Sequence, residues 1–362
     1  MTSASTGPEA AVPARLSILD RSLAREGEHP GAALRDTVSF ARQAEALGYH
    51  RFWVSEHHGV PGIAGSAPTV LASAVASATS RIRVGTGGVM LPNHQPLVVA
   101  EQFGVLESLF PGRIDMGLGR SVGFTDGIRK ALRVGKDAAD GFSEQITELL
   151  AYFDGTGPVH ARPADGLRVP AFLLAVGSGA EIAAEHGLPL VIGAARDEQR
   201  MLDAIETYRA TFRPGGQAPA PYVMVAVNVA VAGSAEEAAR LQVPEAWSTA
   251  VSRTQGAFTP LAAPEDVLAR TMTARERAAY DAARASQLHG TEDEMAAALA
   301  ALTARTGAGE LLLTLNTHDP ADRLDSYRRL AHATGLVPGG DTAPEDSSAP
   351  RAFDPPAVSA PR

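Results

Sequence analysis

The sequence alternates short apolar runs with longer segments of helical periodicity, and this alternation limits the possible folds more than any other feature. Residues 30–47 show the helical pattern, with apolar side chains three or four positions apart and a terminating Gly48. The predicted strands are 16–20, 51–56, 81–91, 113–119, 171–176, 188–194, 222–232 and 309–315. The predicted helices are 30–47, 68–79, 96–109, 142–153, one ending near Gly187, 197–212, 234–241 and 320–333.

Several of these strands are almost continuously apolar, as in YVMVAVNVAVA at 222–232. Parallel strands that helices cover on both faces have this composition. Eight strand–helix units in a chain of this length favour a closed (β/α)₈ barrel, or TIM barrel, over an open doubly wound sheet. The predicted fold class is therefore α/β, with a TIM barrel as its architecture.

Composition excludes several classes of protein. The 362 residues include no cysteine, which excludes a disulfide-stapled secreted fold, a thiol nucleophile and a Cys-ligated metal centre. The formal charge of −9 offers no basic excess for nucleic acid or an anionic membrane. No apolar run approaches the roughly 20 residues of a membrane span, and residues 1–15 lack the hydrophobic core of a signal peptide. We expect a cytoplasmic protein with no nucleic-acid or membrane partner.

The chain is predicted to contain one folded domain, residues 15–336, between two disordered ends. Residues 1–14 lack periodic apolar positions, and residues 337–362 are rich in Pro, Ser, Asp and Gly. Residues 243–290 form an insertion between the seventh and eighth predicted strands, with two or three helical segments. An insertion after a barrel strand lies on the carboxyl-terminal face, where barrel chemistry occurs. This insertion and the loop at 120–141 are therefore candidates for closing a site.

The first candidate motif is Glu56-His57-His58, at the end of the second predicted strand. Residues at this end of barrel strands often carry chemistry, although two loop histidines with ordinary hydrogen bonds would look the same. Adjacent side chains of a strand point to opposite sides, so one of the two histidines should face the pocket. We expect no metal, because the histidines are contiguous and no second tight His/Asp cluster follows a later strand.

Glycine-rich strand ends provide the other candidates. Gly87 and Gly88 lie in GTGGVML (85–91), where glycines allow either a simple bulge or the close approach of a flat ring. Arg120 ends GLGR (117–120), as a surface residue or as a fixed cation for an anionic ligand. Gly177, Ser178, Gly179 and Ala180 open a helix, whose free N–H groups suit a phosphate, although Ser178 could be a plain N-cap.

With these residues in place, the chain resembles the bacterial-luciferase-like family of flavin-dependent oxidoreductases over residues 15–335. The segment SRIRVGTGGVMLPNHQPLVVAEQFGVLESLFPGRIDMGLGR (80–120) is the longest specific match. The other matches are LSILDRSLAREG (16–27), ALGYHRFWVSEHHGVPGIAGSAP (46–68), GSGAEIAAEHGLPL (177–190) and TGAGELLLTLNTHDPADRLDSYRRLA (306–331). The resemblance implies a barrel with an insertion, often a homodimer.

The resemblance also implies roles for the candidate residues. Reduced FMN (FMNH₂), or in some branches the deazaflavin F420, would bind at the barrel mouth. Gly87 and Gly88 align with a non-prolyl cis peptide under the flavin ring, and His57 aligns with the active-site histidine. Arg120 aligns with the phosphate site, as does the turn at 177–180. The residues expected to line the substrate pocket are Glu56, His58, Asn93 and His94.

Three departures from luciferase argue against light emission. Gly119 stands where luciferase has a reactive cysteine, and Ala175 stands where it has an acid. Ala194 and Ala195 replace bulkier residues, which suggests an altered substrate side.

The implied activity is that of a two-component monooxygenase. A separate NAD(P)H:flavin reductase would supply FMNH₂, O₂ would form a flavin C4a-hydroperoxide, and His57 would act as general acid or base beside it. We expect a small organic substrate, such as an aromatic polyketide of secondary metabolism. The alternatives are an F420-dependent reductase or dehydrogenase on the same fold, a non-catalytic flavin-binding protein, and a metal-dependent barrel hydrolase. The bound cofactor and the consumption of O₂ would distinguish them.

Overall fold

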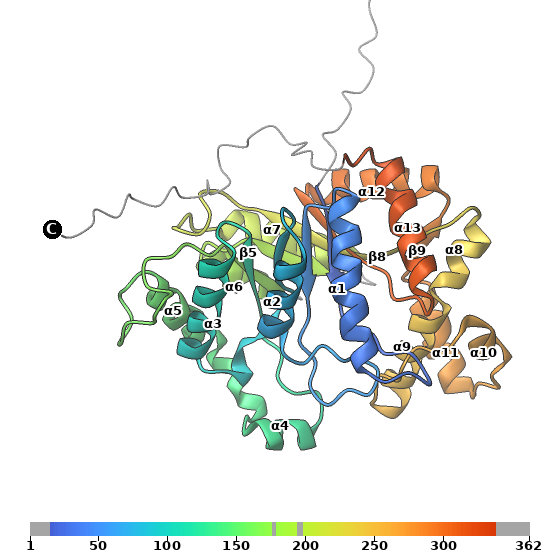
Figure 1. Cartoon of the computed structure of the whole chain (residues 1–362), viewed down its shortest axis with the longest axis horizontal. Coiled ribbons are helices and arrows are strands. Elements are labelled where there is room, and N and C mark those ends of the chain that lie inside the picture. Colours follow the sequence, from blue (N-terminus) through green and yellow to red (C-terminus); the bar gives the residue numbers. More distant parts are fainter. Residues whose placement is uncertain (1–14, 176–178, 194–197, 338–362) are drawn as a thin grey trace, which may run out of the picture.

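The chain forms a closed barrel of parallel strands, which confirms the predicted fold class (Figure 1). The computed structural model describes residues 15–175, 179–193 and 198–337. The barrel strands are β1 (Arg15–Asp20), β2 (Arg51–Val54), β3 (Arg83–Thr86), β5 (Ile114–Gly119), β6 (Ala171–Ala175), β7 (Leu190–Gly193), β8 (Val223–Val231) and β10 (Glu310–Thr314). They pair in this order, and β10 closes the barrel by pairing with both β8 and β1.

Helices surround the barrel, as the alternating pattern predicts. They are α1 (Gly31–Ala46), α2 (Pro68–Ala78), α3 (Pro96–Leu109), α5 (Phe142–Phe153), α6 (Gly179–Glu185), α7 (Glu198–Thr211), α8 (Ala235–Leu241), α12 (Glu292–Thr306) and α13 (Pro320–Ala333). None of the described helices is long and apolar enough to cross a membrane.

The carboxyl-terminal side of the barrel carries additional elements. These are β4 (Val89–Met90), η1 (Leu91–Asn93), α4 (Asp126–Leu132), η2 (Lys136–Gly141), α9 (Val243–Gln255), α10 (Pro264–Ala269), α11 (Ala274–Arg284) and β9 (Leu288–Gly290). Trp247, Tyr280 and their neighbours give α9–α11 a small apolar core of their own. Figure 1 shows α4 and α9–α11 on the same lower side of the molecule.

The amino-terminal part of the barrel interior is filled by buried charges. Arg51 donates to Asp115 (2.8 Å) and to Glu310 (3.0 Å), and Arg83 donates to Asp115 (2.6 Å). Tyr222 also donates to Glu310. Every buried carboxylate here therefore has a cationic partner, as a buried charge requires.

An apolar layer covers these charges on their carboxyl-terminal side. It contains Trp53, Phe172, Val191, Met224 and Leu312, with Leu19, Leu174, Tyr222 and Ala226 packed against it. These residues close the barrel centre, so a ligand can reach only the mouth above them.

The structure differs from the sequence prediction in several elements. The predicted third strand at 81–91 is broken into β3 and β4 at Gly87-Gly88, and both parts pair with β5. Helix α12 and strand β9 had no predicted counterpart, and the long loop at 120–141 contains α4 and η2. The ends predicted as disordered, 1–14 and 337–362, lie outside the described residues except for Val337.

Candidate functional site

The strand alternation determines which side chains reach the barrel mouth. On β1, Ser17 bonds to Glu310 inside the barrel and Leu19 belongs to the interior layer, so Arg21 is the next residue on that side. On β2, Arg51 and Trp53 face the interior, which places Ser55 on the same side. The mouth therefore begins with Arg21 and Ser55 above the apolar layer.

Glycines leave one part of this mouth without side chains. The Gly87-Gly88 peptide bond is cis, the geometry that the family resemblance implies. Among the described residues, a Cβ on Gly119 would have only the Val89 carbonyl oxygen within reach, at 3.8 Å, and a Cβ on Gly193 would meet nothing within 4 Å. A flat ligand could therefore lie against bare backbone here.

A buried carboxylate brings together three of the predicted pocket residues. Glu56 Oε1 accepts hydrogen bonds from Nε2 of His58 (2.6 Å) and Nε2 of His94 (2.8 Å), and Oε2 accepts from the Met90 backbone N–H (2.9 Å). Burial alone would raise the pKa of Glu56, but the two histidine hydrogen bonds outweigh it and lower this pKa to about 2. Since an ionised carboxylate only accepts, both histidines carry a proton on Nε2.

This cluster is also where a metal ion could be sought. The ligand atoms of Glu56, His58 and His94 lie within 4.8 Å of one another. Both Nε2 atoms, however, already contact the same carboxylate oxygen, and a cation would have to replace both hydrogen bonds. We therefore keep the hypothesis that this site works without a metal.

His57 lies apart from the Glu56 cluster. Its Nδ1 contacts Ser55 Oγ at 3.1 Å, and its backbone N–H donates to Gly65 O. Burial, and then the positive charge of Arg21, lower the pKa of His57 to about 4. The imidazole is therefore neutral at physiological pH and can accept a proton.

Among the predicted phosphate residues, Arg120, Gly179 and Ala180 follow two neighbouring strands. Arg120 directly follows β5, and α6 begins at Gly179 just after β6; the two strands pair with Gly119 opposite Leu174. The Arg120 side chain is partly exposed and donates to Ala139 O at 3.0 Å. Gly179 and Ala180 are buried at the start of α6, whereas Gly177 and Ser178 lie outside the described residues.

Asn93 lies in η1, which packs against η2 and α5. Both polar atoms of its side-chain amide are buried and have no hydrogen-bond partner among the described residues. A buried amide without partners is costly, so Asn93 fits a group that binds a ligand or water.

A polar cluster that the sequence does not reveal lies on the side of the mouth away from the glycines. Glu245 of α9 pairs with Arg21 and accepts hydrogen bonds from the side-chain amides of Asn228 and Asn316. Gln242 in turn donates to Asn228 Oδ1 at 2.7 Å. Strand alternation could have placed Arg21 and Asn228 at the mouth, but nothing in the sequence pairs them with Glu245.

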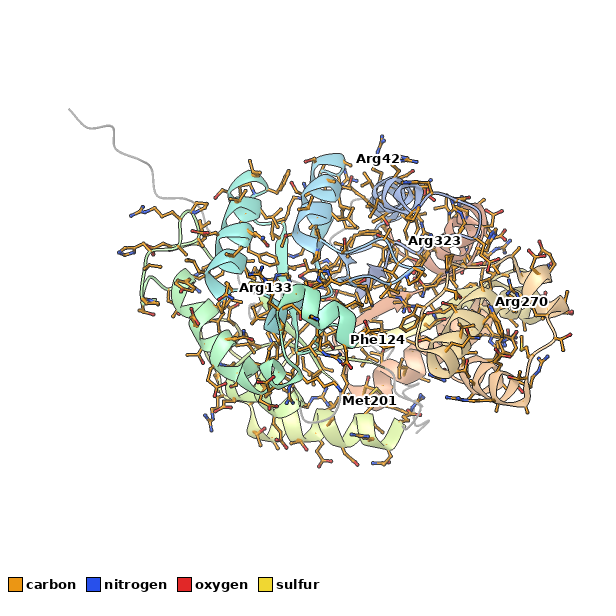
Figure 2. All side chains as sticks on the ribbon, turned by 90° about the horizontal axis from the view of Figure 1, so that it is seen from below. Arg42, Phe124, Arg133, Met201, Arg270 and Arg323 are labelled. Atoms are coloured by element: carbon orange, nitrogen blue, oxygen red, sulfur yellow. The ribbon has the colours of Figure 1, made fainter. Side chains whose placement is uncertain are left out.

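The segments that follow β2, β5 and β8 meet above this mouth. The rings of Phe124 and Phe258 lie 5.8 Å apart, and the Gly62 N–H donates to Phe258 O. Figure 2 looks onto this side, with Phe124 near the middle between α4 and the segment that carries Arg270. The two segments expected to close the site are therefore in contact.

Comparison with known proteins identifies relatives along most of the chain. Residues 15–310 match the family model of luciferase-like monooxygenases. The chain is 37% identical over 321 residues to the uncharacterized protein YvbT of Bacillus subtilis, covering 87% of this chain and 95% of YvbT. It is 35% identical over 320 residues to a luciferase-like monooxygenase of Escherichia coli K12, covering 86% of this chain and 94% of the relative.

Solved structures show the same fold. The crystal structure of apo-MsnO8 superposes with a TM-score of 0.80 at 32% identity, covering 90% of this chain and 99% of MsnO8. The oxygenating constituent of 3,6-diketocamphane monooxygenase, solved with FMN, has a TM-score of 0.67 at 16% identity, with 89% and 97% coverage. An F420-dependent secondary alcohol dehydrogenase has a TM-score of 0.62 at 15% identity, with 89% and 99% coverage.

Proposed function

Because this chain belongs to the luciferase-like monooxygenase family and is a flavin-dependent monooxygenase, we propose that it uses FMN in a two-component reaction. A separate NAD(P)H:flavin reductase would supply the reduced FMN, and O₂ and a small organic molecule would be the substrates. The observation that carries this proposal is the barrel mouth, where bare glycine backbone on one side faces His57, Arg21 and the Asn228 amide on the other.

The residues of the mouth fit a flavin. The cis Gly87-Gly88 bond and the open space at Gly119 and Gly193 leave a face without side chains, as a flat ring requires. Arg120 would pair with the phosphate, together with the backbone of Gly179 and Ala180 at the start of α6 and, as the resemblance implies, of Gly177 and Ser178. When bound, reduced FMN would supply the electrons that activate O₂.

The chain's own residues would bind, orient and exchange protons. Since Nδ1 of His57 contacts Ser55, Nε2 is the nitrogen left to exchange a proton with a reacting oxygen. The imidazole is neutral at physiological pH, so this nitrogen can accept a hydrogen bond from a reacting hydroxyl, and its low pKa means that it would hold a proton only transiently. Glu56 binds Nε2 of both His58 and His94, so it fixes the orientation of these two rings.

Contact between Phe124 and Phe258 would restrict the entry of water. A closed mouth limits the loss of reducing equivalents as hydrogen peroxide. We further propose that the substrate is a small aromatic molecule of secondary metabolism and that the enzyme works as a homodimer.

The test is rapid mixing of the protein and photoreduced FMN with oxygenated buffer. We expect oxidised-flavin absorbance to return more slowly than for free FMN, because the closed mouth would protect bound flavin. We expect His57→Ala to shorten that delay and to lower product formation by roughly 10²- to 10⁴-fold, the usual contribution of a general acid or base. Return at the rate of free FMN, combined with tight binding of F420, would replace this proposal with an F420-dependent reductase.

A further inference from the structure

Arg21 is held at the barrel mouth by the insertion. It is the next interior-facing residue after Leu19, and its Nη2 pairs with Glu245 of α9. Glu245 is fixed in turn by the amides of Asn228 and Asn316, which follow the same interior sides of β8 and β10. Residues from three barrel strands and the insertion therefore fix the direction of one guanidinium group.

This arrangement leaves a buried donor of Arg21 without a partner among the described residues. The Nε–H is buried and has no hydrogen-bond partner among the described residues. A guanidinium offers five N–H donors in a fixed plane, so holding Nη2 on Glu245 also fixes where the Nε–H points. A buried donor without a partner is costly unless a ligand supplies an acceptor.

The charge of the pair determines the class of acceptor. Glu245 offsets the positive charge of Arg21, and burial excludes much of the solvent, with side-chain exposures of 23% and 14%. The pair therefore has no excess charge for an anion, but its buried Nε–H still points in a fixed direction. A neutral oxygen that accepts a single hydrogen bond, such as a carbonyl, matches this donor best.

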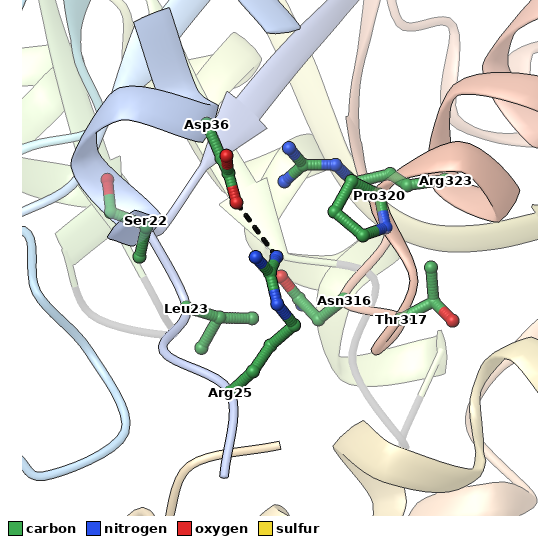
Figure 3. Close-up of a pocket in the computed structure, with 9 residues that line it drawn as sticks. Ser22, Leu23, Arg25, Asp36, Asn316, Thr317, Pro320 and Arg323 are labelled. Atoms are coloured by element: carbon green, nitrogen blue, oxygen red, sulfur yellow. Dashed lines mark ion pairs between the residues drawn. The ribbon is translucent and has the colours of Figure 1, made fainter. Parts of the chain in front are cut away.

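A nearby recess does not explain this buried donor. It is lined by Ser22, Leu23, Arg25, Ala33, Asp36, Asn316, Thr317, Pro320 and Arg323 (Figure 3). Its volume of about 10 Å³ is enough for roughly one water molecule. Arg25 is closed off there by its ion pair with Asp36 at 2.8 Å, and Arg21 does not line this recess.

We propose that Arg21 selects the substrate of this enzyme by donating its Nε–H to a neutral carbonyl oxygen, with Glu245 as the residue that positions it. The inference rests on the proposed function, since it assigns the polar side of the mouth to the substrate and the glycine side to the flavin. It also names a specificity residue that lies in the segment after the first strand, outside the Glu56–His58 motif.

The experiment compares three probes of nearly the same shape by ligand-observed NMR on the full chain. Acetophenone carries the carbonyl, α-methylstyrene replaces its oxygen with CH₂, and benzoate adds a charge. We expect the wild type to bind acetophenone about tenfold more tightly than α-methylstyrene and no less tightly than benzoate, the size of effect typical of one hydrogen bond to a charged donor.

Arg21→Met should abolish the preference for acetophenone, and Arg21→Lys should do the same while retaining a cation opposite Glu245. Lysine keeps α9 docked, so its result stands even if the Met variant does not fold. Arg25→Met is the matched control, because Arg25 pairs with Asp36 and Glu28 outside the mouth, and it should keep the preference.

Equal binding of acetophenone and α-methylstyrene to the wild type would overturn the proposal. A preference for acetophenone that survives in both Arg21 variants would also overturn it. Tighter binding of benzoate than of acetophenone would overturn the inference that the ligand is neutral. FMN fluorescence titration of the same samples distinguishes failure of the Arg21 proposal from failure of the proposed function. A protein that binds FMN but shows no carbonyl preference refutes only the role of Arg21, whereas failure to bind FMN refutes the proposed function.

Discussion

Two neighbouring histidines of the EHH motif have different surroundings, and this difference separates their roles. His58 is bonded to an ionised carboxylate, whereas His57 faces Ser55 and the positive charge of Arg21. An acidic partner fixes a histidine, while desolvation and a cation keep it neutral, with a ring nitrogen that accepts a hydrogen bond and releases any proton readily. His57 is therefore the better proton carrier and His58 the better fixed donor.

Replacing Arg21 should change the titration of His57. With a pKa of about 4, folded His57 stays neutral, while the unfolded side chain titrates near 6.5. This residue therefore stabilises the fold fully above pH 6.5 and progressively less as the pH falls toward 4. Arg21→Met removes a positive charge, so we expect the pKa of His57 to rise toward 6.5, as measured by NMR of its ring protons.

His160→Gln is a suitable reference for that titration, because it removes an exposed histidine that pairs with Asp165, far from Arg21 in the sequence. The pKa of His57 should be unchanged in this variant. An unchanged His57 pKa in Arg21→Met would show that burial alone keeps this histidine neutral.

The residues of the site could be predicted only in part from sequence. His57, Glu56 and the glycines follow strands, and the rule that barrel chemistry lies at strand ends found them. Arg21 and Glu245 lie 224 positions apart, and only the docking of α9 on the mouth brings them together. In the sequence, nothing marks Asn228 and Asn316 as site residues, and only their hydrogen bonds to Glu245 bring them together.

At the level of elements, β5 contains two glycines with opposite requirements. A Cβ on Gly117 would lie 1.9 Å from the Thr86 carbonyl oxygen, which belongs to the neighbouring backbone and cannot move aside. A Cβ on Gly119 would have 3.8 Å to its nearest neighbour. Gly117→Ala should therefore lower the free energy of unfolding by about 3 kcal/mol or more, and Gly119→Ala should change it by less than about 1 kcal/mol.

Urea denaturation of both variants checks this pair, with each serving as the other's control. Equal stability would mean that β3 and β5 can separate enough to admit a methyl group. The same close contact explains why a glycine occurs in the middle of this buried strand.

The contact between the loop after β5 and the insertion should control the coupling of the reaction. Phe124 is 52% exposed yet packs against Phe258, so its ring adds little to the core and more to closure of the mouth. Phe124→Ala should leave the melting temperature nearly unchanged and increase hydrogen peroxide release per reduced flavin several-fold. Val159→Ala, at a similarly exposed apolar residue outside the mouth, should not change peroxide release.

Most elements follow from sequence periodicity, and the exceptions have physical reasons. The third strand breaks because Gly87-Gly88 interrupts its ladder, and the β-type residues on both sides of these glycines make 81–91 look like one strand in the sequence. Helix α12 was not predicted, although Thr291 and Glu294 form a capping box at its start. That Thr-x-x-Glu spacing is a signal that could have found the helix.

At the level of the whole molecule, one outer face lacks the charge that the other helices carry. Helix α2 contains no charged residue, and α3 carries only Glu101 and Glu107. Four large apolar side chains on these packed helices are 44–70% exposed, namely Val70, Val98, Val105 and Leu109. An apolar face with so few charges fits a second copy of the same chain, related by a two-fold axis.

Val98→Glu combined with Val105→Glu should therefore convert a dimer into a monomer, since the two residues lie two helical turns apart on one side of α3 and both copies would bury glutamates without cationic partners. Light scattering during size exclusion measures the mass directly. Leu268→Glu is the matched control, because it places the same charge on an equally exposed apolar residue of α10 and should leave the dimer intact. A wild type that is monomeric at micromolar concentration, or a double variant that stays dimeric, would exclude this face as the interface.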